Sequence, residues 1–193
     1  MEVLFHFIFE LVKIAILASF YAFLILLVFQ GIAKYKPGSW FDKNSRKKLR
    51  LWFLSGLIFS LSLFIYMFSY WGNHGLGDGP RIPIGHGLTI DNTNWTEYGS
   101  IEEIKTSENQ PLEMTKFYVI DDELIGNLDS WFYNYQNVFF VLDLESQELK
   151  EFESKNSFDQ YVKINNLPSS LNLLTFEQNY RNRWGGWRFW LLP

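Results

Sequence analysis

The sequence predicts a membrane protein in which two transmembrane α-helices form a helical hairpin and carry a C-terminal α+β extracytoplasmic domain with mostly antiparallel strands. Three observations support this fold class: long apolar runs in the first third of the chain, a basic stretch that separates them, and a polar remainder of short apolar segments divided by turns. A helix needs roughly 20 apolar residues to cross the hydrocarbon core of a bilayer. Both runs reach that length.

The basic stretch at residues 34–50 predicts the orientation of the chain. Basic loops are retained on the cytoplasmic side of a membrane, so we expect this loop inside and both the N-terminus and the C-terminal domain outside. The composition suits the cytoplasmic (inner) membrane of a bacterium, with the chain crossing it twice. The topology-determining residues are Lys34, Lys36, Lys43, Arg46, Lys47, Lys48 and Arg50.

The two spans are expected at residues 14–33 and 51–71. The first is the uncharged run between Lys13 and the basic loop, and it lacks the basic n-region of a signal peptide, so we interpret it as a retained helix. The second contains no charge and ends in aromatic residues, which favour the headgroup zone and mark the outer boundary near Trp71.

Residues 1–13 are expected to form an amphipathic outer lead-in to the first helix. Four ionisable side chains recur there at spacings of four, four and three, which places them on one helical stripe. One interpretation is an interfacial or tilted helix end whose charged groups reach back to water. The other is that the stripe faces another subunit or an ion path. Its members are Glu2, His6, Glu10 and Lys13.

Charge is divided unevenly along the 193 residues. Residues 1–71 hold eight basic side chains against three acidic ones, whereas residues 72–193 hold nine against eighteen. An acidic outer domain is a poor partner for nucleic acid, whose phosphates require clustered Lys and Arg. The absence of cysteine excludes disulfides, thiolate metal sites and a thiol nucleophile.

The domain at residues 72–193 is predicted to contain two consecutive β-hairpins. Apolar segments at residues 101–106 and 116–120 are typical of strands, and residues 123–126 return after an Asp-Asp turn. Residues 137–144 and 149–153 form a second strand pair around a polar turn. Two similar five-residue segments, at 117–121 and 139–143, are compatible with a duplicated hairpin or with ordinary strand composition.

One helix is predicted at residues 158–166 of this domain. Ser157 would be its N-cap, with Gln160 completing a capping box and Pro168 following its end. The side chains expected on one face are Phe158, Tyr161, Val162 and Asn165. Residues 171–180 fit either a helix or a strand.

The segment at residues 72–87 is rich in glycine and is expected to be turn-rich. It contains a grouping of His74, Asp78, Arg81 and His86. Asp78 and Arg81 could pair across a turn while the histidines stay at the surface. Alternatively, His74, Asp78 and His86 could hold a divalent metal. The glycine spacing matches no phosphate-binding motif, and we expect no cofactor.

The C-terminus is expected to form a β-hairpin turning at Gly185-Gly186, because both positions can take positive φ. Trp184 and Trp187 would then face each other. The aromatic face could complete the core, or it could lie at the outer headgroups or on a partner subunit, where Trp and Arg are favoured. The candidate interface residues here are Trp184, Trp187, Arg188 and Trp190.

No catalytic signature occurs in the sequence, and we expect no catalytic residue. We therefore predict a membrane-anchored accessory or interaction protein. Its expected partners are the lipid bilayer and another membrane or envelope protein, docked on the outer domain and the first helix. Two alternatives stay open: a small membrane enzyme or metal-dependent protein with its site at residues 72–87, and a ligand sensor that signals through the spans.

Overall fold

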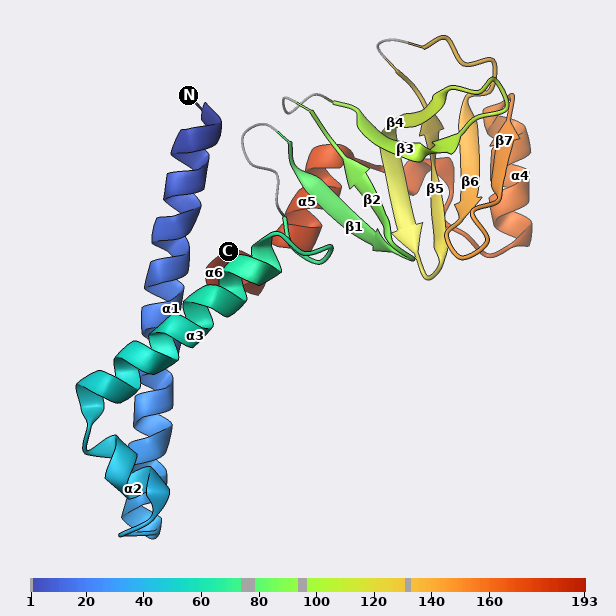
Figure 1. Cartoon of the computed structure of the whole chain (residues 1–193). Coiled ribbons are helices and arrows are strands. Elements are labelled where there is room, and N and C mark those ends of the chain that lie inside the picture. Colours follow the sequence, from blue (N-terminus) through green and yellow to red (C-terminus); the bar gives the residue numbers. More distant parts are fainter. Residues whose placement is uncertain (1, 74–78, 94–96, 131–132) are drawn as a thin grey trace. The chain divides into compact units, whose positions relative to one another are not determined.

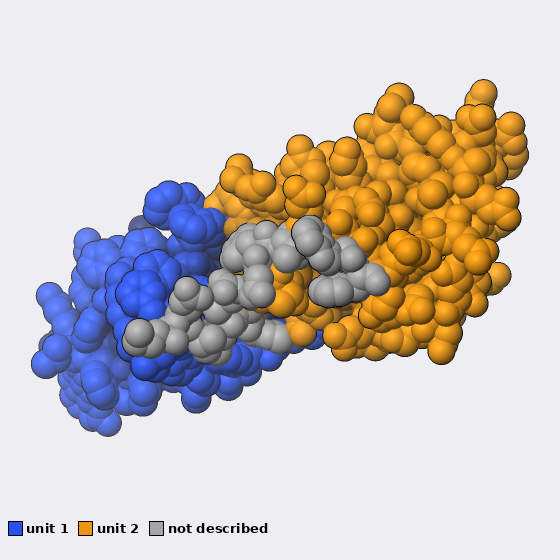
Figure 2. Space-filling model, turned by 90° about the horizontal axis from the view of Figure 1, so that it is seen from above, with its two compact units in different colours: residues 1–72, 187–193 blue, residues 73–186 orange. Residues whose placement is uncertain are grey.

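The computed structural model describes residues 2–73, 79–93, 97–130 and 133–193, with side chains from Leu4 onward (Figure 1). The chain forms two compact units (Figure 2). Unit 1 comprises residues 1–72 and 187–193, and unit 2 comprises residues 73–186. In sequence, unit 2 is therefore inserted between two parts of unit 1.

Unit 1 contains two long apolar helices, α1 (Glu2–Tyr35) and α3 (Lys48–Met67). By length and composition both could cross a membrane, since their apolar segments span 32 and 20 residues with mean hydropathies of 2.5 and 1.7. Helix α1 is continuous from the predicted lead-in to the basic loop, because nothing in its sequence interrupts it before Pro37.

The two long helices pack on each other through small side chains. Ala22 is fully buried, and a Cβ added to Gly56 would lie 3.8 Å from the Cβ of Ala22, so the backbones approach closely at this point. Larger apolar side chains are buried on one side of this point, towards the start of α1 and the end of α3. These are Ile14 and Leu17 of α1 and Leu63 and Met67 of α3.

The predicted basic loop contains a short helix, α2 (Trp40–Ser45), between the end of α1 and the start of α3. Ser39 caps α2 by accepting a hydrogen bond from the amide of Asp42 at 3.3 Å, and Asp42 accepts one from the amide of Gly38 at 2.9 Å. Asp42 also pairs with Arg46 at 2.8 Å, and this hydrogen-bonded guanidinium holds the pKa of the Asp42 carboxyl below its usual range. Phe29 of α1 lies against the ring of Phe41.

The second helix begins and ends earlier than the predicted span. It covers residues 48–67 rather than 51–71, since residues after Met67 form turns. The amide of Ser69 bonds to the carbonyl of Tyr66, and that of Gly72 to the carbonyl of Ser69. A Cβ at Gly72 would lie 2.3 Å from the carbonyl oxygens of Tyr66 and Met67, so this tight exit from α3 requires glycine.

Unit 2 is built on an eight-stranded antiparallel sheet in which neighbours in sequence are neighbours in space from β1 to β7. The eighth strand pairs with β4 at Lys116 and Phe117, beyond the residues of β4 that pair with β3. The strands are β1 (Arg81–Gly85), β2 (Leu88–Asp91), β3 (Gly99–Lys105), β4 (Pro111–Ile120), β5 (Glu123–Leu128), β6 (Phe139–Asp143), β7 (Leu149–Phe152) and β8 (Leu174–Thr175).

Both predicted hairpins are present, as β4–β5 and β6–β7. The predicted strand at residues 116–120 is only the second half of β4. Gly126 lets β5 fit between its neighbours, because a Cβ there would lie 2.7 Å from the Phe140 ring and 2.9 Å from the carbonyl oxygen of Lys116. The turn between β4 and β5 places Asp121 at a φ of 48°.

The prediction of a turn-rich segment at residues 72–87 was wrong for its second half. Residues 81–91 form the β1–β2 hairpin, whose turn is made by His86 and Gly87 at φ values of 50° and 80°. Alternate apolar side chains drive this pairing because they enter the main core. They are Ile82, Ile84, Leu88 and Ile90.

The sheet is strongly curled. Strand β2 pairs with β3 at a single position, Asp91 with Ser100, and then diverges from it. The Nε2 atom of His86 in the β1–β2 turn lies 2.8 Å from an oxygen of Asp122 in the β4–β5 turn. In a flat sheet β2 and β4 would be about 10 Å apart. The first hairpin therefore folds over the face of the later strands and encloses the main core.

Helix α4 (Lys155–Ile164) covers the other face of β6 and β7, as Figure 1 shows. The prediction of its N-cap was wrong: Ser154, not Ser157, caps the helix by accepting a hydrogen bond from the Ser157 amide at 3.3 Å. Phe158 and Val162 are buried on the sheet and Tyr161 is half-buried, as the predicted face required, whereas Asn165 is exposed.

The predicted C-terminal β-hairpin was wrong. The ambiguous residues 171–180 contain part of a 3-10 turn (η1, Ser170–Asn172), then β8, and then the start of α5 (Phe176–Trp184). Thr175 and Gln178 form a capping box that begins α5, and Gly185 ends it. Gly186, at a φ of 62°, leads into a second short helix, α6 (Trp187–Leu191).

Tyr135 links the segment before β6 to the start of β4. Its hydroxyl donates a hydrogen bond to the carbonyl of Pro111 at 2.7 Å and accepts one from the amide of Glu113 at 3.2 Å. Its ring packs on the main core. Burial raises the pKa of Tyr135 to about 12.

We predict that unit 2 loses stability in alkali through Tyr135. The fold holds the neutral phenol, so its contribution is complete below pH ~10, the pKa of an unfolded tyrosine, and is lost as the pH rises towards about 12. Tyr135→Phe should lower the free energy of unfolding by about 1–3 kcal/mol at neutral pH and remove much of this alkaline loss. Urea unfolding of the whole protein in detergent, followed by near-ultraviolet circular dichroism, measures both effects. Tyr133→Phe is the control and should retain the alkaline loss; an unchanged pH profile for Tyr135→Phe would contradict the assignment.

Candidate functional site

The candidate site in unit 1 is the polar stripe of α1 together with α6. The Nε2 atom of His6 lies 3.5 Å from a carboxylate oxygen of Glu10, one turn further along the helix. The Nζ atom of Lys13 lies 5.3 Å from the centroid of the Phe189 ring in α6. The predicted stripe is therefore present for these three residues, while the side chain of Glu2 lies outside those the structure describes.

The rest of the surface of α1 near these residues is apolar and exposed. Leu4, Phe5, Ile8 and Phe9 are between 52% and 75% exposed. With 34 residues at 1.5 Å each, α1 is about 51 Å long, whereas a hydrocarbon core is about 30 Å thick. About 20 Å of largely apolar helix therefore exceeds what a single crossing would use.

Helix α6 packs on α1 through its C-terminal end. The hydroxyl of Tyr21 donates a hydrogen bond to the carbonyl of Leu191 at 2.5 Å. Arg188 stacks on Trp187, with its guanidinium carbon 5.3 Å from the centroid of that ring system. The large apolar side chains of α6 are nevertheless exposed: Trp187 by 62%, Phe189 by 58% and Trp190 by 72%.

A groove of about 200 Å³ lies between α1 and α3 on the same unit. Its walls combine small and aromatic side chains and contain no ionisable group, so the groove offers packing space and no acid or base. The residues that line it are Ala15, Ala18, Ser19, Trp52, Phe53, Gly56, Leu57 and Ser60.

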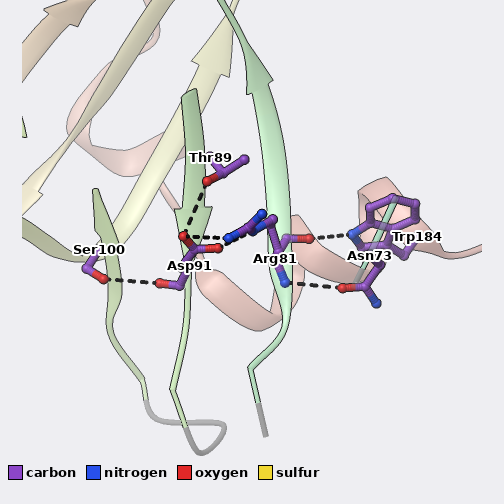
Figure 3. A network of polar contacts seen from close by, with 6 residues as sticks. All are labelled: Asn73, Arg81, Thr89, Asp91, Ser100 and Trp184. Carbon is purple, nitrogen blue, oxygen red and sulfur yellow. Dashed lines mark hydrogen bonds and ion pairs between the residues drawn. The ribbon is translucent and has the colours of Figure 1, made fainter. Parts of the chain in front are cut away.

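Arg81 lies at the centre of a network of hydrogen bonds and an ion pair in unit 2 (Figure 3). Its side chain pairs with Asp91 of β2 at 2.5 Å, and Asp91 also accepts a hydrogen bond from Thr89. Its backbone amide bonds to the side chain of Asn73 at 3.2 Å, and its carbonyl accepts a hydrogen bond from the indole of Trp184 at 2.7 Å. Arg81 thus joins the first residue of unit 2 to the last turn of α5.

The ends of unit 2 also meet directly. The side-chain amide of Asn73 donates a hydrogen bond to the hydroxyl of Tyr180. Trp184 is only 8% exposed, so it belongs to the folded sheet domain. The predicted group of four C-terminal interface residues is therefore divided: Trp184 is an internal hydrogen-bond donor, while Trp187, Arg188 and Trp190 lie together on α6.

The predicted metal site falls partly outside the described residues, since His74 and Asp78 are not among them. His86 is paired with Asp122, and Arg81 with Asp91. Across the described ranges, no group of three or more His, Cys, Asp or Glu side chains is arranged to hold a metal ion.

Two carboxyl groups face each other beside the His86–Asp122 pair. Glu123 and Asp143 are directly opposite on β5 and β6. Burial, and then the charge of Asp143, raise the pKa of Glu123, whereas hydrogen bonds from Ser146 lower the pKa of Asp143. Raising one pKa and lowering the other relieves the repulsion, because Asp143 keeps its charge while Glu123 holds its proton more readily. The β1–β2 turn, the β4–β5 turn and the ends of β5 and β6 therefore bring four ionisable side chains together at one end of the sheet.

Comparison with known proteins assigns no role to these residues. No protein-family model matches the chain, and neither a curated protein nor a solved structure shows significant similarity to it.

We predict that Trp184→Phe destabilises unit 2 where α5 packs against β1. The substitution removes the indole donor to the Arg81 carbonyl and part of the buried ring, which should lower the free energy of unfolding by about 1–3 kcal/mol. Hydrogen exchange should become faster in β1 and α5. The same substitution at the exposed Trp187 is the matched control and should leave exchange in unit 2 unchanged. Equal protection in Trp184→Phe and the unmodified protein would show that the Arg81 network contributes little.

Proposed function

We propose that this protein is a membrane-anchored accessory protein of the bacterial cytoplasmic membrane, with α2 and its basic loop inside and unit 2 outside. In this proposal α1 and α3 cross the bilayer as a hairpin. A partner membrane or envelope protein docks on the outer part of α1 and on the outer domain. The protein holds or positions that partner and catalyses no reaction.

The exposed apolar surface of unit 1 supports the anchor. In the most apolar windows of α1 and α3, only 22% and 6% of residues are buried within the chain. The core helix of a soluble protein would be mostly buried, because exposed apolar area costs about 25 cal/mol per Å² in water. A bilayer removes this area from water, and the positive charge of residues 34–50 favours the cytoplasmic side for the loop.

The observation that carries the proposed docking is the surplus length of α1. Its outer turns present Phe5 and Phe9 one turn apart, both more than half exposed, next to a narrow stripe made by His6 and Glu10. Large exposed aromatic side chains beside ionisable groups are a combination that interfaces between proteins use. A helix of a partner could cover both the aromatic surface and the stripe.

We predict the orientation from this arrangement. The chain has no cysteine, so single cysteines can be introduced without background: Lys43→Cys in α2 and Ser146→Cys in the turn after β6, both exposed. In intact spheroplasts a membrane-impermeant maleimide should label position 146 at once and position 43 only after lysis. Labelling in the reverse order would invert the topology, and labelling of both sites before lysis would contradict the two-span anchor.

We also predict a specific neighbour for the outer turns of α1. A photoreactive benzoylphenylalanine in place of Phe5 or Phe9 should crosslink in cells to one discrete protein, in an amount comparable to that of the anchored chain. The matched control is the same replacement of Phe53, an exposed phenylalanine of α3 that should contact lipid. If positions 5 and 9 crosslink only to lipid, as position 53 should, docking on α1 is wrong.

A further inference from the structure

Helix α6 carries a concentrated aromatic surface that the proposed anchor does not explain. Trp187, Phe189 and Trp190 fall within four consecutive residues and are all more than half exposed, and Leu191 is 40% exposed. The helix belongs to unit 1, the unit of the two long apolar helices, although it follows unit 2 in sequence. Its position on α1 indicates what covers these side chains.

Two contacts fix α6 along the axis of α1. Phe189 lies at Lys13, and the carbonyl of Leu191 lies at Tyr21. Eight residues of helix separate Lys13 from Tyr21, which corresponds to about 12 Å along the axis. Both positions fall within the apolar segment Leu4–Tyr35. Helix α6 therefore lies beside the part of α1 that can cross a membrane.

The depth of this contact follows from the length of the span. A hydrocarbon core of about 30 Å takes up about 20 residues of helix. Counted outward from the basic loop, it ends near Ile14, just inside Lys13. Tyr21 is then about 10 Å below the outer boundary, and a typical tilt of about 20° shortens this depth by less than 1 Å. The end of α6 thus lies among acyl chains, and its start lies near the headgroups.

The composition of α6 fits that position. Tryptophan is enriched at the membrane–water boundary because its ring is apolar and its N–H seeks a polar partner. Arg188 stacks on Trp187, which lets a cation remain next to apolar surface. Phe189 covers the ammonium group of Lys13, so the charge at the boundary is shielded on one side by a ring.

We propose that α6 is embedded in the outer leaflet as a third membrane contact, with its exposed aromatic side chains facing phospholipid. The inference depends on the proposed membrane anchor. It adds that unit 2 is attached to the bilayer at both of its ends, through α3 before it and α6 after it. The occupant of the aromatic surface is the lipid of the outer leaflet.

Fluorescence quenching in vesicles tests this directly. Trp190→Cys and Leu191→Cys are each labelled with an environment-sensitive dye in the full chain, reconstituted in vesicles of phosphatidylethanolamine and phosphatidylglycerol. The second variant leaves all three aromatic residues of α6 in place. Nitroxide groups on the lipid acyl chains report contact with lipid, and iodide reports contact with water. Leu57→Cys, exposed on α3, is the lipid-facing control, and Leu171→Cys, which is 82% exposed on unit 2, is the water-facing control.

We expect lipid nitroxides to quench positions 190 and 191 several-fold more than position 171, with iodide showing the opposite order. The ratio of quenching by a shallow nitroxide to quenching by a deep one should be higher at position 190, in the outer leaflet, than at position 57, near the middle of α3. Quenching of 190 and 191 by iodide, while 57 is quenched by lipid, would overturn the inference and leave the anchor intact. Protection of 190 and 191 from both quenchers would show that protein covers α6, and this also overturns it. Failure of lipid nitroxides to quench position 57 would contradict the proposed anchor itself.

Discussion

The apolar surface of α1 and α3 is the constraint on which the rest of this molecule depends. The two helices bury only part of it against each other, with their closest approach at Ala22 and Gly56, and many of their large apolar side chains are exposed. Small residues at a crossing are what helices use where lipid, rather than water, fills the space around them. Charge is also divided along the chain, with a basic loop between α1 and α3 and an acidic sheet domain that follows α3 in sequence.

The sheet domain has a different basis for its stability. Its main core is shared by strands distant in sequence, because the first hairpin folds back over the later strands. Glycine at position 99 permits this: a Cβ there would lie 2.6 Å from Ile90 and 3.0 Å from the ring of Phe176. A second, smaller core lies under α4. Both cores consist of residues of unit 2 alone.

Local patterns predicted local structure. Residues close together in sequence were enough to predict the hairpins β4–β5 and β6–β7, the apolar face of α4 and the spacing of His6 with Glu10. Strand β1 was not, because Pro83 and its flanking glycines dominate the local pattern, while the burial of Ile82 and Ile84 depends on distant strands. The C-terminal error has a similar cause. Gly185-Gly186 is as compatible with a helix end as with a hairpin turn, and the deciding signal was the capping box of Thr175 and Gln178, seven to ten residues before Gly185.

The functional residues divide in the same way. The ionisable stripe on α1 could be found by counting helical spacing, but the partners of Arg81 could not, since Asp91, Asn73 and Trp184 come from three separate elements. Similarly, no sequence pattern relates Phe189 to Lys13 across 176 residues. Long-range contacts of this kind arise from packing and are visible only once the chain is folded.

The meeting of Asn73 with Tyr180 at the base of the sheet domain has a consequence for how the chain is organised. A domain whose first residue contacts its last helix can be placed within another fold at little entropic cost, because it closes the connecting loop by its own folding. The sheet domain is therefore an inserted domain, since the sequence of unit 1 continues after it. Only Gly185 and Gly186 separate its last helix, α5, from α6, so the chain passes from unit 2 back to unit 1 through a linker of two residues.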